Sequence, residues 1–304
     1  MKTLGYFDLF QYPITKEEIR LFHTEDTSYA LIDSELKALE NDKFIFRFDE
    51  FYTLHNDHAL IQRRKKGNLL ALEQMVTARK VARLLSKFPF TKAVAVSGSL
   101  SKNFATEKTD IDFFIITAAN RLWIARTCMH LYKKLTFLAG RQHWFCMNYY
   151  VDEAGLEITE KNIFTATEIV TLLPMQGKSS FCDFVASNAW TEKYFPLQHF
   201  TGGNIPEIKH GSLRRSFEKI LSGRVGDTID KWLMRITDRR WQKKAKRKQL
   251  NSKGGSMGMA VARHFSKPDP KNFQARVIEQ YQVKVQQVLQ LFNKKPVTDK
   301  VQEF

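Results

Sequence analysis

The sequence predicts an α+β protein, because segments with the apolar spacing of helices alternate with short apolar runs typical of strands. Its 304 residues are 43% hydrophobic and include 24 phenylalanines, enough for a real core and for two or three domains. No stretch approaches 18 consecutive apolar residues, and residues 1–10 lack the pattern of a secretory signal. The three cysteines are widely spaced and form no CxxC pattern, which is typical of reduced thiols. We therefore expect a cytoplasmic protein without a membrane span.

Residues 1–60 are predicted to be a compact helical unit that ends in a hairpin. Thr15 and Glu18 have the spacing of a capping box and begin a short helix. A second helix is expected near Ser34, and two short apolar runs around Asp49-Glu50 indicate a hairpin. Helices followed by a hairpin resemble a winged-helix domain. Its recognition helix would be net acidic, so packing on the rest of the chain or protein binding is favoured over DNA reading.

A basic linker, residues 61–67, is expected to precede a small mixed-sheet domain over 68–195. The domain's first helix, 68–87, carries an apolar stripe that we expect to face the core: Leu69, Leu72, Met75, Val76, Val81, Leu84 and Leu85. The later elements expected are strands at 94–96, 111–117 and 143–151, and helices at 121–138 and 165–173, the last of them ended by Pro174.

Polar residues follow one of these strands and begin the next. The first strand leads to Gly98, where a residue without Cβ permits close approach of the backbone to a ligand. Ser99 then starts a short helical turn whose free N–H groups and hydroxyl can hold a phosphate. After a spacer of ten residues come Asp110 and Asp112. Because side chains alternate along a strand, both aspartates project from one face while Ile111 points into the core.

Asp110 and Asp112 together form a candidate metal site. Two carboxylates roughly 7 Å apart along a strand repel each other unless a cation bridges them. Mg²⁺ prefers oxygen ligands of this kind, usually one or two carboxylates completed by water and substrate phosphate; Mn²⁺ is the alternative ion. The pair therefore predicts a metal-dependent site in which both aspartates are catalytic.

The pattern of Gly98-Ser99, ten residues, and Asp110-x-Asp112 on an apolar strand resembles the signature of the DNA polymerase β-type nucleotidyltransferase superfamily. The resemblance covers about 85 residues, 68–151, and includes the order helix, strand, turn, strand, helix, strand. It implies that the Gly-Ser turn binds the phosphates of an NTP and that the two aspartates bind the metal. The expected reaction moves an NMP from an NTP to an acceptor hydroxyl and releases pyrophosphate.

Two positions differ from the family pattern. Small members often have an Arg-Gly pair after the turn, where this chain has Lys102, which can still contact a phosphate. Active members usually carry a third carboxylate on a later strand. That strand here has Asn148, with Asp152 and Glu153 just beyond. The alternative is therefore a catalytically degenerate domain that senses nucleotide or binds nucleic acid.

The C-terminal region, 196–304, is expected to be basic and mainly helical. The net charge of the chain is +16, and residues 201–304 hold 23 Lys and Arg against 9 Asp and Glu. A basic run at 238–248 follows apolar residues with helical spacing, which fits contact with RNA phosphates, docking on an anionic membrane, or a solvated helix end. An NTP is the expected substrate. The acceptor is open: an RNA bound through this region, a protein hydroxyl, a small molecule or a nucleotide.

Overall fold

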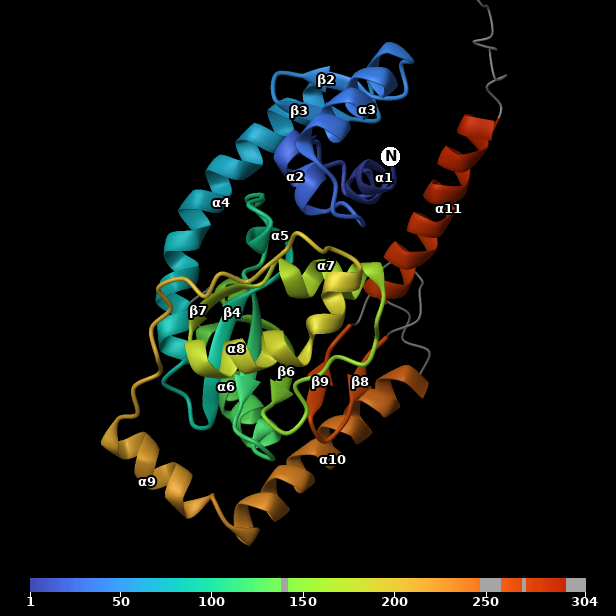
Figure 1. Cartoon of the computed structure of the whole chain (residues 1–304). Coiled ribbons are helices and arrows are strands. Elements are labelled where there is room, and N and C mark those ends of the chain that lie inside the picture. Colours follow the sequence, from blue (N-terminus) through green and yellow to red (C-terminus); the bar gives the residue numbers. More distant parts are fainter. Residues whose placement is uncertain (138–141, 247–257, 270–271, 294–304) are drawn as a thin grey trace, which may run out of the picture. The chain divides into compact units, whose positions relative to one another are not determined.

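The computed structural model describes residues 1–137, 142–246, 258–269 and 272–293. Contacts divide the chain into two compact units, Met1–Arg64 with Ala275–Phe304, and Lys65–Gln274 (Figure 1). Both units combine helices with a sheet, and the sheet of the second unit is mixed, so the predicted α+β class is confirmed. None of the described helices is long and apolar enough to cross a membrane. The domain boundaries expected from the sequence stay a prediction.

The first unit has the order helix, strand, helix, helix, strand, strand. Its elements are α1 (Lys2–Asp8), β1 (Ile14–Thr15), α2 (Lys16–Leu21), α3 (Tyr29–Asn41), β2 (Phe46–Phe48) and β3 (Phe51–Thr53), joined by most of α11 (Phe273–Asn293). The strands form an antiparallel sheet in the order β1-β3-β2. The capping box is confirmed: Glu18 N–H donates to Thr15 Oγ1, and Thr15 N–H donates to Glu18 Oε2. The winged-helix resemblance stays a prediction.

Helix α3 begins earlier than the sequence analysis expects. It starts at Tyr29 and not near Ser34, because the Ser28 hydroxyl accepts from the N–H of Leu31 and caps the helix at 3.3 Å. The acidic residues in the predicted start region therefore lie in the interior of the helix.

Helix α4 (His58–Leu85) runs without interruption through residues 61–67, the segment expected to be a linker. The long unbranched side chains in this segment have high helix propensity, and that outweighs its single glycine. Gly67 has a packing role, because the ring of Phe104 fills the space that a Cβ would need. The division between the two units falls inside this helix, at Arg64 and Lys65.

The predicted apolar stripe of α4 is buried only in part: Val81 and Leu85 lie in the core, and Met75 and Leu84 pack against it. Leu69, Leu72 and Val76 are each more than half exposed. The side chains that face the core are mostly small: Ala71, Ala78, Val81, Ala82 and Leu85. Alanines let the helix approach the sheet closely, a packing feature that a count of large apolar residues does not detect.

The second unit is built on a six-stranded sheet in the order β7-β4-β5-β6-β9-β8. Its strands are β4 (Thr91–Val96), β5 (Asp112–Thr117), β6 (Cys146–Asp152), β7 (Leu173–Gln176), β8 (Ala260–Val261) and β9 (Phe265–Lys267). The two central strands β5 and β6 are parallel, and the other neighbours are antiparallel. The connection between β5 and β6 is helix α6 (Leu122–Phe137), as a parallel pair requires.

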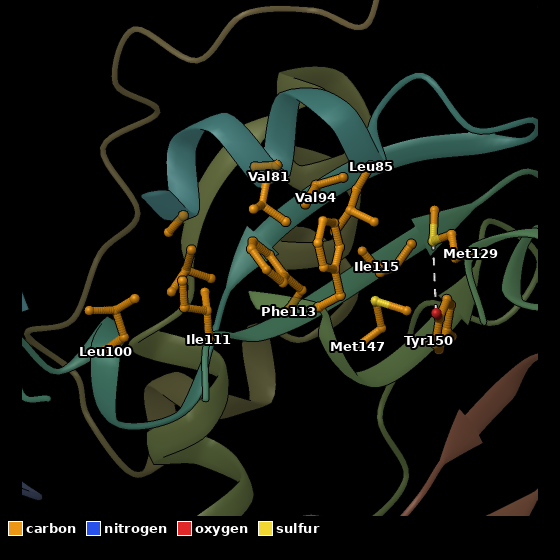
Figure 2. Packing of buried hydrophobic residues seen from close by; sticks show 14 of the residues in the cluster. Val81, Leu85, Val94, Leu100, Ile111, Phe113, Ile115, Met129, Met147 and Tyr150 are labelled. Atoms are coloured by element: carbon orange, nitrogen blue, oxygen red, sulfur yellow. Dashed lines mark hydrogen bonds between the residues drawn. The ribbon is translucent and has the colours of Figure 1, made fainter. Parts of the chain in front are cut away.

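Alternating side chains give the sheet two buried faces. One face packs on α4 and α6 through a cluster that includes Val81, Leu85, Val94, Phe113, Ile115 and Met129 (Figure 2). The opposite face packs on α8 (Lys178–Ser187) through Ala93, Ala95, Phe114, Ile116, Phe181 and Phe184. Residues 93–96 and 113–116 are buried on both faces, which explains why they read as continuous apolar runs.

Three short strands of this sheet, β7, β8 and β9, were not expected from the sequence. Pro174 was expected to end a helix over 165–173. Helix α7 (Ile163–Val170) ends earlier, and Pro174 lies in β7, an edge strand where a residue without N–H is tolerated. The region after residue 196, expected to be mainly helical, contributes β8 and β9 in addition to α9 (Ser212–Ile220) and α10 (Arg224–Lys246). Strands of two or three residues carry too little periodicity to be recognised.

Candidate functional site

The chain turns sharply after β4, at Gly98, the first residue of the short helix α5 (Gly98–Ser101). Its φ of +67° lies in the left-handed region, which costs other residues about 1–2 kcal/mol. A Cβ at Gly98 would lie 2.5 Å from Oδ2 of Asp112. The space left by the missing side chain is therefore occupied by a carboxylate of the protein itself, and not left open for a ligand.

Backbone contacts hold the turn against the start of β5. The N–H of Ser97 donates to the carbonyl of Asp112 at 2.9 Å. Leu100 anchors the other side of the turn in the core, while Ser99 remains partly exposed. The glycine–serine turn and the second aspartate, 14 positions apart in the sequence, are thus in direct contact.

Asp112 is the first residue of β5 and is partly buried. Its Oδ1 accepts a hydrogen bond of 2.5 Å from the side-chain amide of Asn148 on β6. The pKa of Asp112 is raised to about 6, chiefly by burial and also by the negative charges of Asp110 and Glu168, against the opposing effects of Cys146 and Lys102. A cation beside this carboxylate would favour its ionised form and so offset both the effect of burial and the repulsion by the neighbouring negative charges.

Asp110 precedes β5 and is more exposed than Asp112. Its Oδ1 lies 2.6 Å from Nδ1 of His143, in the 3₁₀ turn η1 (Gln142–Trp144) that leads into β6. The N–H of Ile111 donates to the carbonyl of His143 at 3.1 Å, which fixes this turn beside the strand. Ile111 itself is 2% exposed, so the expectation that it points into the core is confirmed.

Lys102 ends the turn with its ammonium between two oxygens. Nζ donates to the carbonyl of Gly98 at 3.1 Å and to Oε1 of Glu168, on α7, at 2.8 Å. Both side chains are largely shielded from solvent: that of Lys102 is 18% exposed and that of Glu168 is 31% exposed. Lys102, the cation that the sequence assigns to a phosphate, is therefore paired with a carboxylate in this structure, and that pair links α7 to the end of α5.

Of the three candidates for a further polar group, the structure brings only Asn148 to the aspartates. Asp152 pairs with Thr117, at the opposite end of β5, about 17 Å along the strand from Asp112. Asp152 is fully buried there and accepts from the backbone N–H groups of Asn120 and Ala154. Glu153, the next residue, accepts from the hydroxyl of Ser180 at 2.9 Å.

Three side chains of the site were missed from the sequence: His143, Cys146 and Glu168. The thiol of Cys146 donates to Oδ1 of Asn148 at 3.1 Å, and burial raises its pKa to about 12, so the group is a neutral hydrogen-bond donor. Glu168 follows Asp112 by 56 positions on a different element, so no local spacing marks it. Across the described ranges, no group of three or more His, Cys, Asp and Glu side chains has the arrangement of a complete metal site.

Comparison with known proteins gives one match. Residues 78–171 match the family model described as nucleotidyltransferase domain. The matched segment runs from the second half of α4 to the end of α7, and so includes the turn, both aspartates, Asn148 and Glu168. No curated protein and no solved structure matches the chain.

Proposed function

We propose that this chain, whose residues 78–171 form a nucleotidyltransferase domain, moves an NMP from an NTP to an acceptor hydroxyl with a divalent cation held by Asp110 and Asp112. The observation that carries the proposal is the contact between the Asp112 carboxylate and Gly98. Because the turn assigned to the phosphates adjoins the carboxylate assigned to the cation, a single metal-bound triphosphate can touch both.

The residues present fit Mg²⁺ or Mn²⁺. The Asp112 carboxylate is partly buried beside two further negative charges, Asp110 and Glu168, an arrangement that a cation stabilises. Two carboxylates suffice, since Mg²⁺ usually completes its shell with water and substrate phosphate. When bound, the ion would neutralise charge on the triphosphate and polarise the α-phosphate.

Neighbouring side chains orient the two proposed ligands. Asn148 donates to one oxygen of Asp112, and His143 lies in hydrogen-bond contact with one oxygen of Asp110. Each contact restricts the rotation of a carboxylate and leaves its other oxygen for the cation, as second-layer partners of metal ligands commonly do. The precision of this arrangement matters, because positioning supplies much of the rate enhancement in such reactions.

The transfer forms a bond from the acceptor oxygen to the α-phosphorus, breaks the bond to the pyrophosphate oxygen and releases the hydroxyl proton. The amide of Asn148 cannot take that proton, so we assign it to Glu168. A triphosphate carries more negative charge than one carboxylate and competes for the ammonium of Lys102, which now pairs with Glu168. Nucleotide binding therefore leaves the Glu168 carboxylate without its partner, and able to accept the proton.

The test is transfer of label from each α-labelled NTP, with Mg²⁺ or Mn²⁺, to RNA, protein, small-molecule and nucleotide acceptors. Wild type should transfer label, and Asp110→Asn and Asp112→Asn should lose transfer by at least about a hundredfold. Asp183→Asn, a change of the same kind at an exposed position on α8, should retain it. Equal activity in all three variants would end the proposal.

A second function is favoured by one observation, the amide of Asn148 beside Asp112. A domain with an amide at this place can bind a metal-nucleotide complex and sense it without transfer. The two functions separate in the same experiment. Nucleotide binding that depends on Asp112, without transfer to any acceptor class, would support the sensing function and overturn the enzymatic one.

A further inference from the structure

Helix α10 has three acidic side chains, and other parts of the fold engage two of them, Asp227 and Asp230. Asp227 forms an ion pair of 2.5 Å with Arg121, which follows β5. Asp230 is buried and accepts from the N–H of Ile124 at the start of α6. Asp238 accepts from Gln242 one turn further along the same helix. Asp227 also acts on Lys231, but among the described residues of α10 no carboxylate forms an ion pair with Arg235, Arg239 or Lys243 farther along its outer side.

The outer side of α10 carries a line of exposed cations. They are separated by four to seven positions and so share one face of the helix: Arg224, Lys231, Arg235, Arg239 and Lys243. We call this set the α10 stripe. Trp232 lies within it and is 60% exposed. Throughout the described part of the chain, no carboxylate lies within ion-pair distance of Arg235, Arg239 or Lys243.

The apolar side of α10 is already covered by the fold. Leu233 and Met234 pack on the main core cluster, and Ile229 packs beside Phe90 and Ile124. An amphipathic helix that binds a membrane needs a free apolar face to insert between lipids. On α10 that face is used for folding, so the free face offers mainly charge, with one large aromatic ring.

We propose that the α10 stripe binds single-stranded RNA. Cations four positions apart lie about 6 Å apart along a helix and can follow the phosphates of an extended strand. Trp232 offers a flat ring on which an unpaired base can stack between these charges, the combination typical of single-strand binding surfaces. RNA is the natural source of unpaired bases, since DNA is mainly a duplex whose bases are already stacked.

The α10 stripe is separate from the nucleotide site. Its helix is attached by Arg121 and Ile124, which lie beyond the C-terminal end of β5, whereas Asp112 begins that strand. RNA binding at α10 therefore does not rest on the proposed function and can be measured without turnover.

The experiment measures binding of the full chain to a labelled 20-nucleotide oligouridine over a range of salt concentrations. The test variant neutralises three stripe cations, Arg235→Gln, Arg239→Gln and Lys243→Gln, because glutamine keeps helix propensity. The control neutralises three exposed cations of α4: Arg79→Gln, Lys80→Gln and Arg83→Gln. Both variants lower the net charge equally, so only the position differs. Circular dichroism confirms that each remains folded.

Loss of three phosphate contacts should reduce the slope of log K against log salt by about 2, at roughly 0.7 per contact. At 0.15 M salt the affinity of the stripe variant should fall at least tenfold, and that of the α4 variant less than threefold. Trp232→Leu should weaken oligouridine about tenfold through lost stacking, with little change in the salt slope. These three results together support the proposal.

Equal losses in the stripe and α4 variants would show attraction to net charge alone and overturn the proposal. Ile220 at the end of α9 and Val225 at the start of α10 are exposed, which makes an anionic membrane the competing partner. Vesicles of phosphatidylserine and phosphatidylcholine that bind through the stripe more tightly than oligouridine would also overturn it. Tighter binding of oligothymidine or of duplex DNA than of oligouridine would do the same.

Discussion

Replacing Gly98 by alanine tests the contact on which the site depends. The added Cβ would lie 2.5 Å from Oδ2 of Asp112, closer than real carbon–oxygen contacts allow. The backbone of Gly98 cannot relieve this without leaving its φ of +67°. The carboxylate of Asp112 must therefore shift and lose its hydrogen bond from Asn148.

A matched control separates backbone strain from carboxylate displacement. Gly202 has a φ of +73°, and the nearest atom to its Cβ position, Cε of Lys178, lies at 3.9 Å. Gly202→Ala should therefore lower the free energy of unfolding by the backbone cost alone, about 1–2 kcal/mol. Gly98→Ala should lower it by about 1–3 kcal/mol more, since a partly buried polar group also loses its partner.

The activity readout is pyrophosphate release from each NTP, with Mn²⁺ affinity measured by calorimetry. Displacing a positioned carboxylate by about 1 Å should lower turnover about a hundredfold. Gly98→Ala should lose that activity and bind Mn²⁺ more weakly, while Gly202→Ala should resemble wild type in both measurements.

A double variant completes the test. In the Asp112→Ala background the clash is gone, so Gly98→Ala should then lower the free energy of unfolding no more than Gly202→Ala does. The coupling between positions 98 and 112 should thus be about 1–3 kcal/mol. Full activity and Mn²⁺ affinity in Gly98→Ala, or a coupling near zero, would refute the reasoning.

Four further predictions concern single side chains. Lys102→Gln should raise the KM for NTP about tenfold, because the loss of one charge contact weakens NTP binding by about 1.4 kcal/mol. Glu168→Gln should lower kcat and leave nucleotide affinity within about threefold of wild type. The pKa of His130 is lowered to about 3, chiefly by burial and also by nearby cations. Its contribution to the free energy of unfolding is therefore complete above pH 6.5 and declines as the pH falls toward 3. At pH 5 the free energy of unfolding in urea should be lower by about 1–2 kcal/mol, a loss that His130→Gln removes. Arg214 is buried and donates to the carbonyls of Ser86 and Thr91 at 2.6 and 2.7 Å, so Arg214→Met should lower the free energy of unfolding by about 3 kcal/mol.

The predictions for Lys102, His130 and Arg214 each have their own control or contradicting outcome. Lowered stability with an unchanged KM in Lys102→Gln would mean that the ammonium only joins α5 to α7. For His130, the decisive quantity is the difference between wild type and variant at pH 7.5 and at pH 5, because other groups titrate in both proteins; an equal difference at both values would contradict the prediction. For Arg214, the neighbouring Arg215 is exposed, and Arg215→Met should change stability by less than about 0.5 kcal/mol.

Local features of this chain followed from its sequence because they depend on neighbouring residues. The capping box at Thr15 needs only a side chain and an N–H three positions apart, and the structure contains it. The burial of Ile111 follows from alternation along a strand. The order of helix, strand, turn, strand, helix and strand around Gly98 has the same origin.

Other features required packing between distant segments. The face of α4 that meets the sheet is rich in alanine, which allows close approach, so Leu69 and Leu72 lie outside it although Leu85 is buried. The partners of the aspartates are decided in the same way: Asn148 arrives on the parallel strand β6, and Glu168 arrives on α7 through Lys102. The family resemblance points to Asn148 only as one of three candidates, and Glu168 has no spacing that marks it in the sequence.

Strand alternation and glycine chemistry act over a few residues, so the glycine–serine turn after one buried strand and the two aspartates at the entry of the next were predictable from neighbouring residues. Their surroundings depend on segments that lie far apart in the chain. The Asp112 carboxylate fills the space beside Gly98, and Glu168 pairs with the ammonium of Lys102, the group that the sequence assigns to a phosphate. These contacts join residues far apart in the chain, and their geometry is set by the packing of whole helices on the sheet.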